Sequence, residues 1–516
     1  MKKIFKTITI YLGVLLLAGV ATTIFCAGFL FFYRDGNIFG IQYIKTDKII
    51  YARESADMAN LERIEINSKN YDVAVKVNPN VDNLIGAMRN KVFGYAIKSK
   101  AQAKFTLEYN EVTRTATFNT VEPKGWLNKS DAYIEIAIPQ DFAENVIDLV
   151  ISTNKGDITV GGSNSWDIGK INVKSSKGDA SFKNIIINET LTLSPGSGCF
   201  SVANSCSTAT GGINARLSVG SGTIDLTKFD TEKFKLNTVE IVKNSRGEIN
   251  ILQAKELVSN GNINGGGKIQ VKEIGFVDFT SLDTNVYINS IVNNATSRIK
   301  LTGTGKAIIN RALCSLEITA DDGDIKVGSA TGTLALSTRH GDIKVVEALK
   351  LVSAVTIYGN IDISFGESAL DYADTTINDG NKNRAVIATT KNGHIIVKGL
   401  QNGTITATES GRISLSYDRV VGDNVIVGSL GAVNIVVPNP ETNESNECAF
   451  NLKVNSGVSA DIKVGAAGSI GRVDFSESGI HEFTNIYNNA SSTTNNLNIE
   501  SSTGPIKIRS LDLVKY

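Results

Sequence analysis

The chain has 516 residues, of which 42% are apolar and 20% are charged, a balance typical of a folded protein rather than a disordered one. Its 52 basic and 52 acidic side chains cancel, which removes the electrostatic basis for binding nucleic acid. Only 7 prolines accompany 47 glycines, so we expect many tight turns and few rigid breaks.

The N-terminal segment Ile8–Phe32 carries no charge. A helix of this length rises about 37 Å, enough to cross a hydrocarbon core of about 30 Å. Three lysines precede the run, so the positive-inside rule places the N-terminus in the cytoplasm. The run exceeds the apolar region of a cleaved signal peptide, and Phe25 stands before Cys26 where a lipoprotein signal has a small residue. We therefore predict an uncleaved single-pass anchor in the plasma membrane, with the bulk of the chain extracellular or periplasmic.

The rest of the chain changes from irregular to repetitive after about residue 145. A segment near Asn110–Glu111 is typical of a hairpin turn, and Tyr71 occupies the place that glycine takes in later repeats. The predicted parts are a cytoplasmic N-terminus (1–7), a transmembrane helix (8–32), a juxtamembrane spacer (33–60), an irregular β cap with a first repeat (61–145) and a β-solenoid repeat domain (146–516).

A glycine recurs through this repeat domain, most often every 18 to 25 residues, as from Gly305 to Gly323 and from Gly222 to Gly247. The second and fourth residues after each glycine are apolar. The residue between them is polar in every copy except at Ile308 and Ile396. The glycines are Gly156, Gly178, Gly198, Gly222, Gly247, Gly267, Gly305, Gly323, Gly341, Gly359, Gly393, Gly411, Gly431 and Gly504. Such alternation, rich in Ile and Val, predicts a half-buried strand after each glycine.

Each copy therefore reads as strand, corner, strand and short return. We expect the corner glycine to adopt a positive φ. Copies stacked about 4.8 Å apart would close one continuous apolar core. The predicted fold is all-β, a parallel β-solenoid of about 18–25-residue rungs preceded by one transmembrane α-helix. A β-sandwich or a string of meander domains is the alternative, but neither requires one glycine register along most of the chain.

The successive segments RIEINSKNYDVAV, AYIEIAIPQDF and LVISTNKGDITVGG resemble the bacterial β-strand-repeat proteins of unknown function regarded as candidate adhesins. The resemblance runs from about Leu61 to the C-terminus. It implies a β-solenoid outside a membrane helix, with no agreed catalytic residues to carry over. This chain departs from the pattern where glycine is replaced, at Tyr71, Thr284 and Ala460.

The strongest cluster of polar residues follows two successive glycines and consists of Asp324, Lys326, Asp342 and Lys344. Stacked rungs would place the two carboxylates about 5 Å apart, and likewise the two ammonium groups. Such a carboxylate pair could bind Ca²⁺ or act as an acid–base pair. The interpretation that we favour is a solvated face, where each exposed ion pair contributes less than about 1 kcal/mol. The neighbouring Asp321 and Asp322 lack the distal Glu of a calcium loop.

The histidines are His340, His394 and His481, and the first two stand on opposite sides of their glycines. We therefore do not expect them to share a metal. Of the five cysteines, Cys26 lies in the apolar run, and Cys199, Cys206, Cys314 and Cys448 form no CxxC pair, which argues against structural zinc. Cys199 and Cys206 could form a local disulfide in an oxidising compartment or remain thiols. We assign no catalytic, cofactor-binding or metal-binding residue, and no cofactor.

Function is predicted as a ranked set. The first hypothesis is a cell-surface, membrane-anchored structural or interaction protein, adhesin-like and without catalytic activity. Its partners would be the lipid bilayer, through Ile8–Phe32, and either a surface glycan or a protein. One alternative is a polysaccharide-active β-helix lyase or hydrolase using Asp324, Asp342, Lys326 and Lys344. The other is an envelope sensor that acts through a membrane partner. Aromatic residues make up only 7% and do not line one face, which argues against a long sugar-stacking groove.

Overall fold

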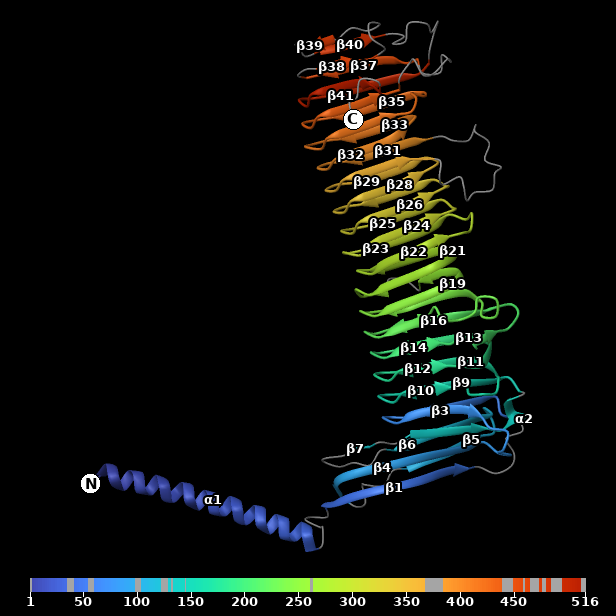
Figure 1. Cartoon of the computed structure of the whole chain (residues 1–516), viewed down its shortest axis with the longest axis vertical. Helices are drawn as coiled ribbons and strands as arrows, with labels where there is room; N and C mark the ends of the chain where they lie inside the picture. The colour runs from blue at the N-terminus through green and yellow to red at the C-terminus, as the bar shows by residue number, and fades with distance from the viewer. Residues whose placement is uncertain are drawn as a thin grey trace. The chain divides into compact units, whose positions relative to one another are not determined.

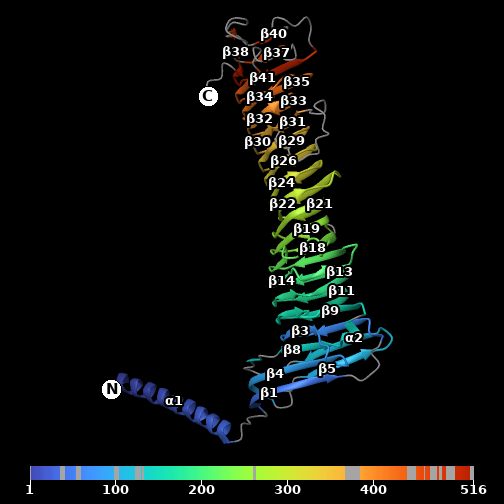
Figure 2. The same ribbon diagram turned by 45° about the vertical axis from the view of Figure 1, so that its right-hand side comes forward.

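The computed structural model describes residues 2–34, 41–53, 60–97, 104–121, 129–130, 133–143, 145–259, 263–366, 384–438, 449–457, 460–464, 473–475, 479–483 and 494–511. The chain divides into two units, one made of residues 1–192 and 198–209 and the other of residues 193–197 and 210–516. Figures 1 and 2 show the whole chain from two directions.

The first unit begins with helix α1, Lys2–Arg34. Its segment Thr9–Cys26 is long and apolar enough to cross a membrane, and none of it is buried. The hydroxyls of Thr22 and Thr23 donate to the carbonyls of Ala18 and Gly19, each at 2.6 Å, so the helix itself satisfies these polar groups. An apolar helix of this kind is the expected form of a membrane anchor.

The strands of the first unit are β1 (Ile41–Arg53), β2 (Arg63–Asn67), β3 (Asp72–Val77), β4 (Ile85–Ile97), β5 (Lys104–Asn110), β6 (Thr115–Val121), β7 (Lys129–Ser130), β8 (Tyr133–Ile138), β9 (Ile147–Thr153), β10 (Ile158–Val160), β11 (Trp166–Ser175), β12 (Ala180–Phe182), β13 (Ile185–Pro195, its end in the second unit), β14 (Cys199–Val202) and β15 (Ser207–Thr208). A short helix, α2 (Gln140–Ala143), follows β8.

The early strands of this unit pair mainly antiparallel. β1 lies in the range assigned to a juxtamembrane spacer and pairs with β4, which also pairs with β7 and β8. β5 and β6 form a hairpin, and the Oδ1 atom of Asn110 accepts the backbone N–H groups of Val112 and Thr113 at 3.0 and 3.1 Å. β2 pairs in parallel with β6 and β9, and β3 pairs in parallel with β8 and β10. The later strands of this unit continue the parallel pairing, with Ile158 opposite Ala180 and Ala180 opposite Phe200.

The strands of the second unit are β16 (Ile213–Val219), β17 (Thr223–Leu226), β18 (Leu236–Asn244), β19 (Glu248–Ser259), β20 (Ile263–Asn264), β21 (Lys268–Leu282), β22 (Asn285–Ile291), β23 (Ser297–Thr302), β24 (Ala307–Ala312), β25 (Leu316–Ala320), β26 (Ile325–Ala330), β27 (Leu334–Thr338), β28 (Ile343–Ala348), β29 (Val352–Thr356), β30 (Ile361–Phe365), β31 (Ala385–Thr390), β32 (Ile395–Leu400), β33 (Asn402–Ala407), β34 (Ile413–Tyr417), β35 (Asp423–Gly428), β36 (Val433–Val437), β37 (Asn451–Ser456), β38 (Ala460–Lys463), β39 (Val473–Phe475), β40 (Gly479–Phe483), β41 (Asn496–Ser501) and β42 (Ile506–Ser510).

These strands form two parallel ladders. One ladder contains β23, β25, β27, β29, β31, β33 and β35, and the other contains β22, β24, β26, β28, β30, β32, β34 and β36. From β22 to β34, each strand therefore pairs with the strand two places further along, and Figure 1 shows these rungs stacked in yellow and orange. The predicted fold, a parallel β-solenoid with one apolar N-terminal helix, is confirmed.

The C-terminal rungs depart from chain order. β35 pairs with β41 and β36 with β42, while β37 and β38 pair with the other sides of β41 and β42. The copy that contains Ala460 thus lies beyond the copy at Gly504, although it precedes it in the sequence. The prediction that Ala460 takes the glycine position is wrong, because Ala460 lies opposite Ile506 and Ile462 opposite Ile508, so Ala460 is the first buried apolar residue after the corner. β40 and β39 then pair antiparallel with β37 and β38 and occupy their outer hydrogen-bonding groups, which limits edge-to-edge association.

The core consists of the apolar columns predicted from the repeat. The second and fourth residues after every repeat glycine are at most 3% exposed. Ile343 and Val345, for example, are 0% and 1% exposed and lie opposite Ile325 and Val327 of the preceding rung. Burying each such side chain contributes roughly 1.5–3 kcal/mol. The stacked Ile and Val columns are therefore the main source of stability.

The repeat glycines are required by close stacking, and the prediction that they adopt a positive φ is wrong. Among the residues that the structure describes, the glycines with positive φ are Gly161, Gly212, Gly265, Gly303, Gly399 and Gly422, all outside the repeat positions. A Cβ on Gly341 would instead overlap the carbonyl oxygen of Gly323, and a Cβ on Gly359 would overlap that of Gly341. Successive corners approach so closely that a side chain has no room.

Candidate functional site

The structure brings the predicted Asp–Lys cluster together on successive rungs. Ile325 lies opposite Ile343 and Lys326 opposite Lys344, so the two aspartates occupy equivalent corner positions. Oδ1 of Asp324 accepts the backbone N–H of Asp342 at 3.2 Å. Each aspartate is therefore part of the hydrogen bonding that joins one corner to the next.

The same bond recurs at other corners with different acceptors. In the first unit, Oδ1 of Asp72 accepts the N–H of Asp157 at 2.8 Å, and Oδ1 of Asp157 accepts the N–H of Asp179 at 2.8 Å. In the second unit, Nδ1 of His394 accepts the N–H of Arg412 at 3.1 Å. Asp, Asn and His all supply an acceptor at this distance from the backbone. Where the residue after a repeat glycine is Asp, Asn or His, its side chain thus joins one corner to the next, and His394 shares this role.

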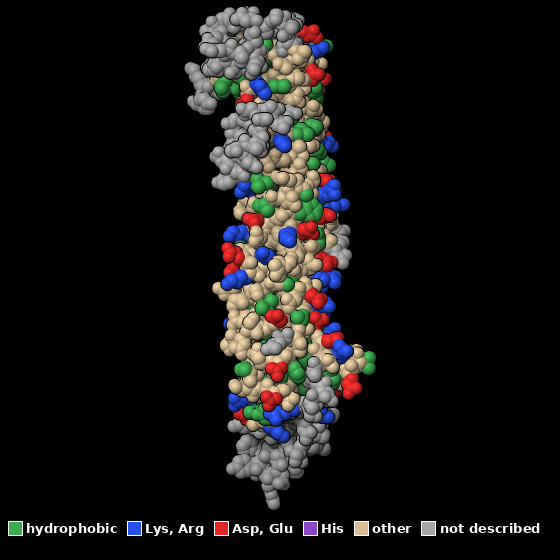
Figure 3. Space-filling model, turned by 90° about the vertical axis from the view of Figure 1, so that its right-hand side faces the viewer, with side chains coloured by type: hydrophobic (Ala, Val, Ile, Leu, Met, Phe, Trp, Pro, Cys, Tyr) green, Lys and Arg blue, Asp and Glu red, His purple; other side chains and the backbone are tan. Residues whose placement is uncertain are grey.

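Outward-facing lysine and aspartate side chains on neighbouring rungs of this region form ion pairs. Nζ of Lys306 lies 2.7 Å from Oδ2 of Asp324, and Nζ of Lys344 lies 3.2 Å from Oδ2 of Asp362. The hydrogen bond from Lys306 lowers the pKa of Asp324 and outweighs the opposing effect of partial burial. A general acid needs a raised pKa, so Asp324 is poorly suited to that role. Figure 3 shows acidic and basic side chains interspersed along one face, as such pairing requires.

His340 belongs to a polar cluster at the corner before β28. Its Nδ1 lies 2.6 Å from Oδ1 of Asp322, which Arg339 also approaches at 3.4 Å. The imidazole stacks on the ring of Tyr358, with centroids 4.9 Å apart and planes 4° from parallel. The hydrogen bond from His340 is the main cause that lowers the pKa of Asp322. This arrangement fixes the corner side chains against one another.

The remaining predicted residues lie apart from this cluster. His481 lies in β40 opposite Val454. Cys199 is exposed, whereas Cys206 is buried, and its Sγ donates to the carbonyl of Phe182 at 3.2 Å, with no disulfide between them. Burial raises the pKa of Cys206. Cys448 lies outside the described residues. Within the described ranges no group of three or more His, Cys, Asp or Glu side chains could hold a metal ion.

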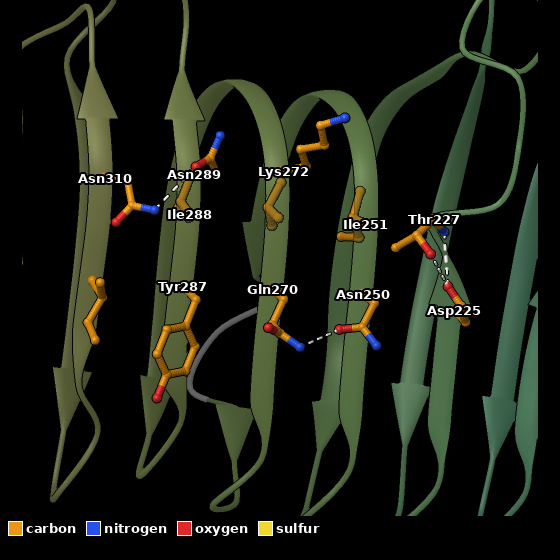
Figure 4. A pocket seen from close by; sticks show the side chains of 12 residues that line it. Asp225, Thr227, Asn250, Ile251, Gln270, Lys272, Tyr287, Ile288, Asn289 and Asn310 are labelled. Atoms are coloured by element: carbon orange, nitrogen blue, oxygen red, sulfur yellow. Dashed lines mark hydrogen bonds between the residues drawn. The ribbon is translucent and has the colours of Figure 1, made fainter. Parts of the chain in front are cut away.

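An open groove of about 540 Å³ lies on the outer face of β17, β19, β21, β22 and β24, and we call it the amide groove. The side chains that define it are Asp225, Asn250, Gln270, Tyr287, Asn289 and Asn310 (Figure 4). All belong to the second unit.

Strand register places several of these side chains in one row that crosses neighbouring strands. Asn250 lies opposite Gln270, and Gln270 lies opposite Tyr287. The next strand continues this row with Ile308, opposite Tyr287. Because alternate residues of a strand point to opposite faces, these side chains point outward while Ile251 and Ile288 point toward the core. Neighbouring members of a row are therefore one rung, about 4.8 Å, apart.

Hydrogen bonds fix the orientation of the amides. Nε2 of Gln270 donates to Oδ1 of Asn250 at 2.8 Å, and it also contacts Oε1 of Glu248. Nδ2 of Asn310 donates to Oδ1 of Asn289 at 3.2 Å. Both pairs are drawn in Figure 4. The amides are thus pre-organised across neighbouring rungs, which lowers the entropic cost of binding a ligand.

Charges lie at the borders of the amide groove. Partial burial tends to raise the pKa of Asp225, but hydrogen bonds from Thr227 and the ion pair with Lys228 outweigh it and lower this pKa. The carboxylate of Asp225 is therefore ionised at neutral pH, with Nζ of Lys228 3.3 Å away. At the start of β21, two residues before Gln270, Nζ of Lys268 lies 5.3 Å from the centroid of the Tyr287 ring and 3.5 Å from Oε1 of Glu248. These neighbouring charges compensate one another.

Sequence reasoning did not identify the amide groove, although a signal for it was present. The residue between the two apolar positions of each repeat is Asn250, Gln270, Tyr287 and then Ile308 in successive copies. This is an uncharged row that ends before Lys326. Within its own copy, Ile308 stands out only as a departure from the polar pattern. Comparing the residue between the two apolar positions from one copy to the next would have indicated an uncharged surface.

Residues 61–264 match the family model of the Toastrack domain, DUF4097. This match begins where the sequence resemblance begins, and the predicted recognition of a β-strand-repeat family of unknown function is confirmed. The amide groove extends beyond it, since Gln270, Tyr287 and Asn310 lie outside the matched residues.

One solved structure similar to this chain is a candidate cell adhesion protein from Clostridium sporogenes. The alignment covers 90% of this chain and 100% of that one, at 9% sequence identity and a TM-score of 0.14. No curated protein matches this chain.

Proposed function

We propose that the protein is a membrane-anchored, adhesin-like interaction protein that holds a ligand in the amide groove without transforming it. The supporting observation is a difference between two sets of polar side chains, one bonded to the backbone and the other facing solvent. Asp324 and Asp342, the residues predicted for an enzymatic alternative, accept backbone N–H groups at the corners. The amides of the groove instead point to solvent in an open concavity. Such an arrangement suits recognition, because it offers hydrogen bonds but no poised acid or base.

The anchor supports the same proposal. Helix α1 contains the apolar segment Thr9–Cys26, and basic residues concentrate before it. On this basis Ile8–Phe32 contacts the lipid bilayer, the N-terminus is cytoplasmic, and the β-solenoid lies outside the plasma membrane, extracellular or periplasmic. A ligand-binding surface in that position would contact material at the cell exterior.

Labelling of cysteines tests this topology. Cys199 is exposed, while Cys206 and Cys314 are buried. Cys26 is exposed as well, so both Cys26 and Cys448 are first replaced by Ser. In that background, a membrane-impermeant maleimide should label the full chain equally in intact spheroplasts and in lysed ones, and Cys199→Ser should abolish the signal. Labelling that requires lysis would place the β-solenoid inside the cell and refute the proposed location.

Attachment assays test the binding role. Asn310→Trp should obstruct the amide groove, because Asn310 is exposed at its border. The matched control is Asn434→Trp, at an exposed position of β36 in the same ladder but away from the groove. Cells expressing Asn310→Trp should attach to their natural surface no better than cells lacking the protein, while the control behaves as wild type. Equal attachment by all strains would overturn the proposal.

A further inference from the structure

We infer that the amide groove binds an uncharged polysaccharide chain through its hydroxyl groups. This inference rests on the proposed function and names the ligand class for the same site. It follows from the kind, spacing and charge of the side chains around Asn250, Gln270 and Tyr287.

The amides provide the hydrogen-bonding chemistry. A sugar hydroxyl donates one hydrogen bond and accepts others, and a carboxamide presents a donor and an acceptor side by side. The bonds between the paired amides use Nε2 of Gln270 and Nδ2 of Asn310 as donors. Oε1 of Gln270 and Nδ2 of Asn250 make no hydrogen bond within the described part of the chain. One acceptor and one donor on adjacent rungs thus remain for neighbouring hydroxyls.

Apolar surface accompanies these polar groups. Tyr287 and Ile308 continue the row that begins with Asn250 and Gln270, and both side chains are partly exposed. Sugar rings have apolar C–H faces that pack on aromatic rings, while the phenol keeps a polar end in water. Lys268 beside Tyr287 makes the ring environment electropositive without adding net charge, because Glu248 pairs with it. A row of amides followed by an aromatic ring therefore matches the mixed surface of a glycan.

Electrostatics favour a neutral chain over an acidic one. Asp225 is ionised at one border of the groove, and Lys272 is exposed at the same concavity. Their opposite charges give the groove no excess of cations with which to hold a polyuronate or another acidic glycan. The side chains between them are uncharged.

The backbone argues against an extended peptide as the ligand. Peptides that bind to sheets usually pair with a free strand edge. In the groove, β21 pairs with β19 on one side and β22 on the other, and β22 pairs onward with β24. No strand edge is open there, so recognition must come from side chains. Four steps between rungs span about 19 Å, room for a short run of sugar units.

Calorimetric titration of the full-length protein in detergent micelles tests this inference. The probes are cellohexaose and chitohexaose, which are neutral, and hexagalacturonate, which is acidic. The variants are Tyr287→Ala and Gln270→Ala, with Asn434→Ala as the matched control on the same ladder outside the groove. Thermal unfolding followed by circular dichroism establishes that each variant is folded before titration.

We expect at least one neutral hexasaccharide to bind, with affinity about 2- to 12-fold weaker for Tyr287→Ala, the range expected for loss of one aromatic contact. Gln270→Ala should also weaken binding, and Asn434→Ala should leave it unchanged. Tighter binding of hexagalacturonate, or neutral binding that neither groove variant weakens, would overturn the inference. If neither neutral probe binds but Asn310→Trp still abolishes cell attachment, the ligand class is wrong while the proposed binding role stands. If a neutral probe binds at the groove but attachment never depends on it, the adhesive role fails and the glycan site remains.

Discussion

Oδ1 of Asp342 lies 2.8 Å from the backbone nitrogen of Asn360 on the next rung, and the same atom accepts the side-chain Nδ2 of Asn360 at 3.2 Å. Backbone N–H groups at a corner point away from the regular strand ladder, and each still needs an acceptor. The carboxylate supplies it. The recurring Gly-Asp pair is therefore a stacking element, with the glycine permitting close approach and the aspartate joining the two corners.

Two substitutions at Asp342 should distinguish the contribution of its hydrogen-bond acceptor to stability from the contribution of its negative charge. Asp342→Ala removes the acceptor and should lower the free energy of unfolding by about 0.5–1.5 kcal/mol. Asp342→Asn keeps an oxygen in the same place and should cost less. Urea denaturation of both variants gives the comparison. Equal losses for Asn and Ala would mean that the negative charge, and not the acceptor, stabilises the corner.

Gly341 should tolerate no side chain. A Cβ there would overlap the carbonyl oxygen of Gly323, so Gly341→Ala must push adjacent rungs apart. We expect a loss of about 1–3 kcal/mol in the free energy of unfolding, as for other overpacked sites. The matched control is Gly211→Ala, because nothing lies within 4 Å of a Cβ built on Gly211. Thermal unfolding that is equally unchanged in both variants would contradict the close-stacking explanation.

Two adjacent threonines in β31 provide an internal comparison of inward and outward polar groups. Thr390 is 0% exposed, and its Oγ1 donates to the carbonyl of Gly359 at 3.1 Å. Thr390→Val should leave this carbonyl short of a partner and cost about 1–3 kcal/mol. Thr389→Val changes the partly exposed neighbour on the other face and should have an effect within about 0.5 kcal/mol. Chemical denaturation that ranks the two variants in the opposite order would show that the buried hydroxyl does not stabilise the corner.

The fold could be predicted from the sequence because one pattern specifies it repeatedly. Ile343, Val345 and their equivalents occur at fixed distances after each glycine, and period-two burial follows directly from strand geometry. The reason for the glycine was not predictable, because positive φ and close approach of two backbones both select glycine from sequence alone. The order in which the last rungs stack could not be predicted from the sequence either. Copies near Ala460 and Gly504 present similar apolar columns, so either could follow β35 and β36.

The candidate site was harder to predict than the fold. The paired positions of Asp324 and Asp342 followed from the repeat, but their use as backbone acceptors depends on rotamers and corner geometry. The amide groove depends on side chains that are widely separated in the sequence, such as Asp225 and Asn310. Concavity arises from differences in side-chain size between rungs, and a pattern defined by what the rungs share cannot reveal it.

The last prediction concerns the pH dependence of the Lys306–Asp324 ion pair. The hydrogen bond from Lys306 lowers the pKa of Asp324 in the folded state, so this carboxylate stabilises the fold at pH values above its unfolded pKa of about 3.9. That contribution is lost as the pH falls through the lower folded-state pKa. Both side chains are about half exposed, at 50% and 49%, so solvent screening keeps the contribution under about 1 kcal/mol.

Asp324→Asn retains an acceptor for the N–H of Asp342 and removes only the charge, so it isolates the ion pair. At low ionic strength the wild type should be slightly more stable than Asp324→Asn at pH 7, and the difference should vanish by about pH 2–3. In a Lys306→Met background, which lacks the partner, the same substitution should show little of this pH dependence. A difference that grows as the solution is acidified would reverse the sign expected from a lowered pKa, and it would show that the carboxylate of Asp324 is destabilised, not stabilised, by folding.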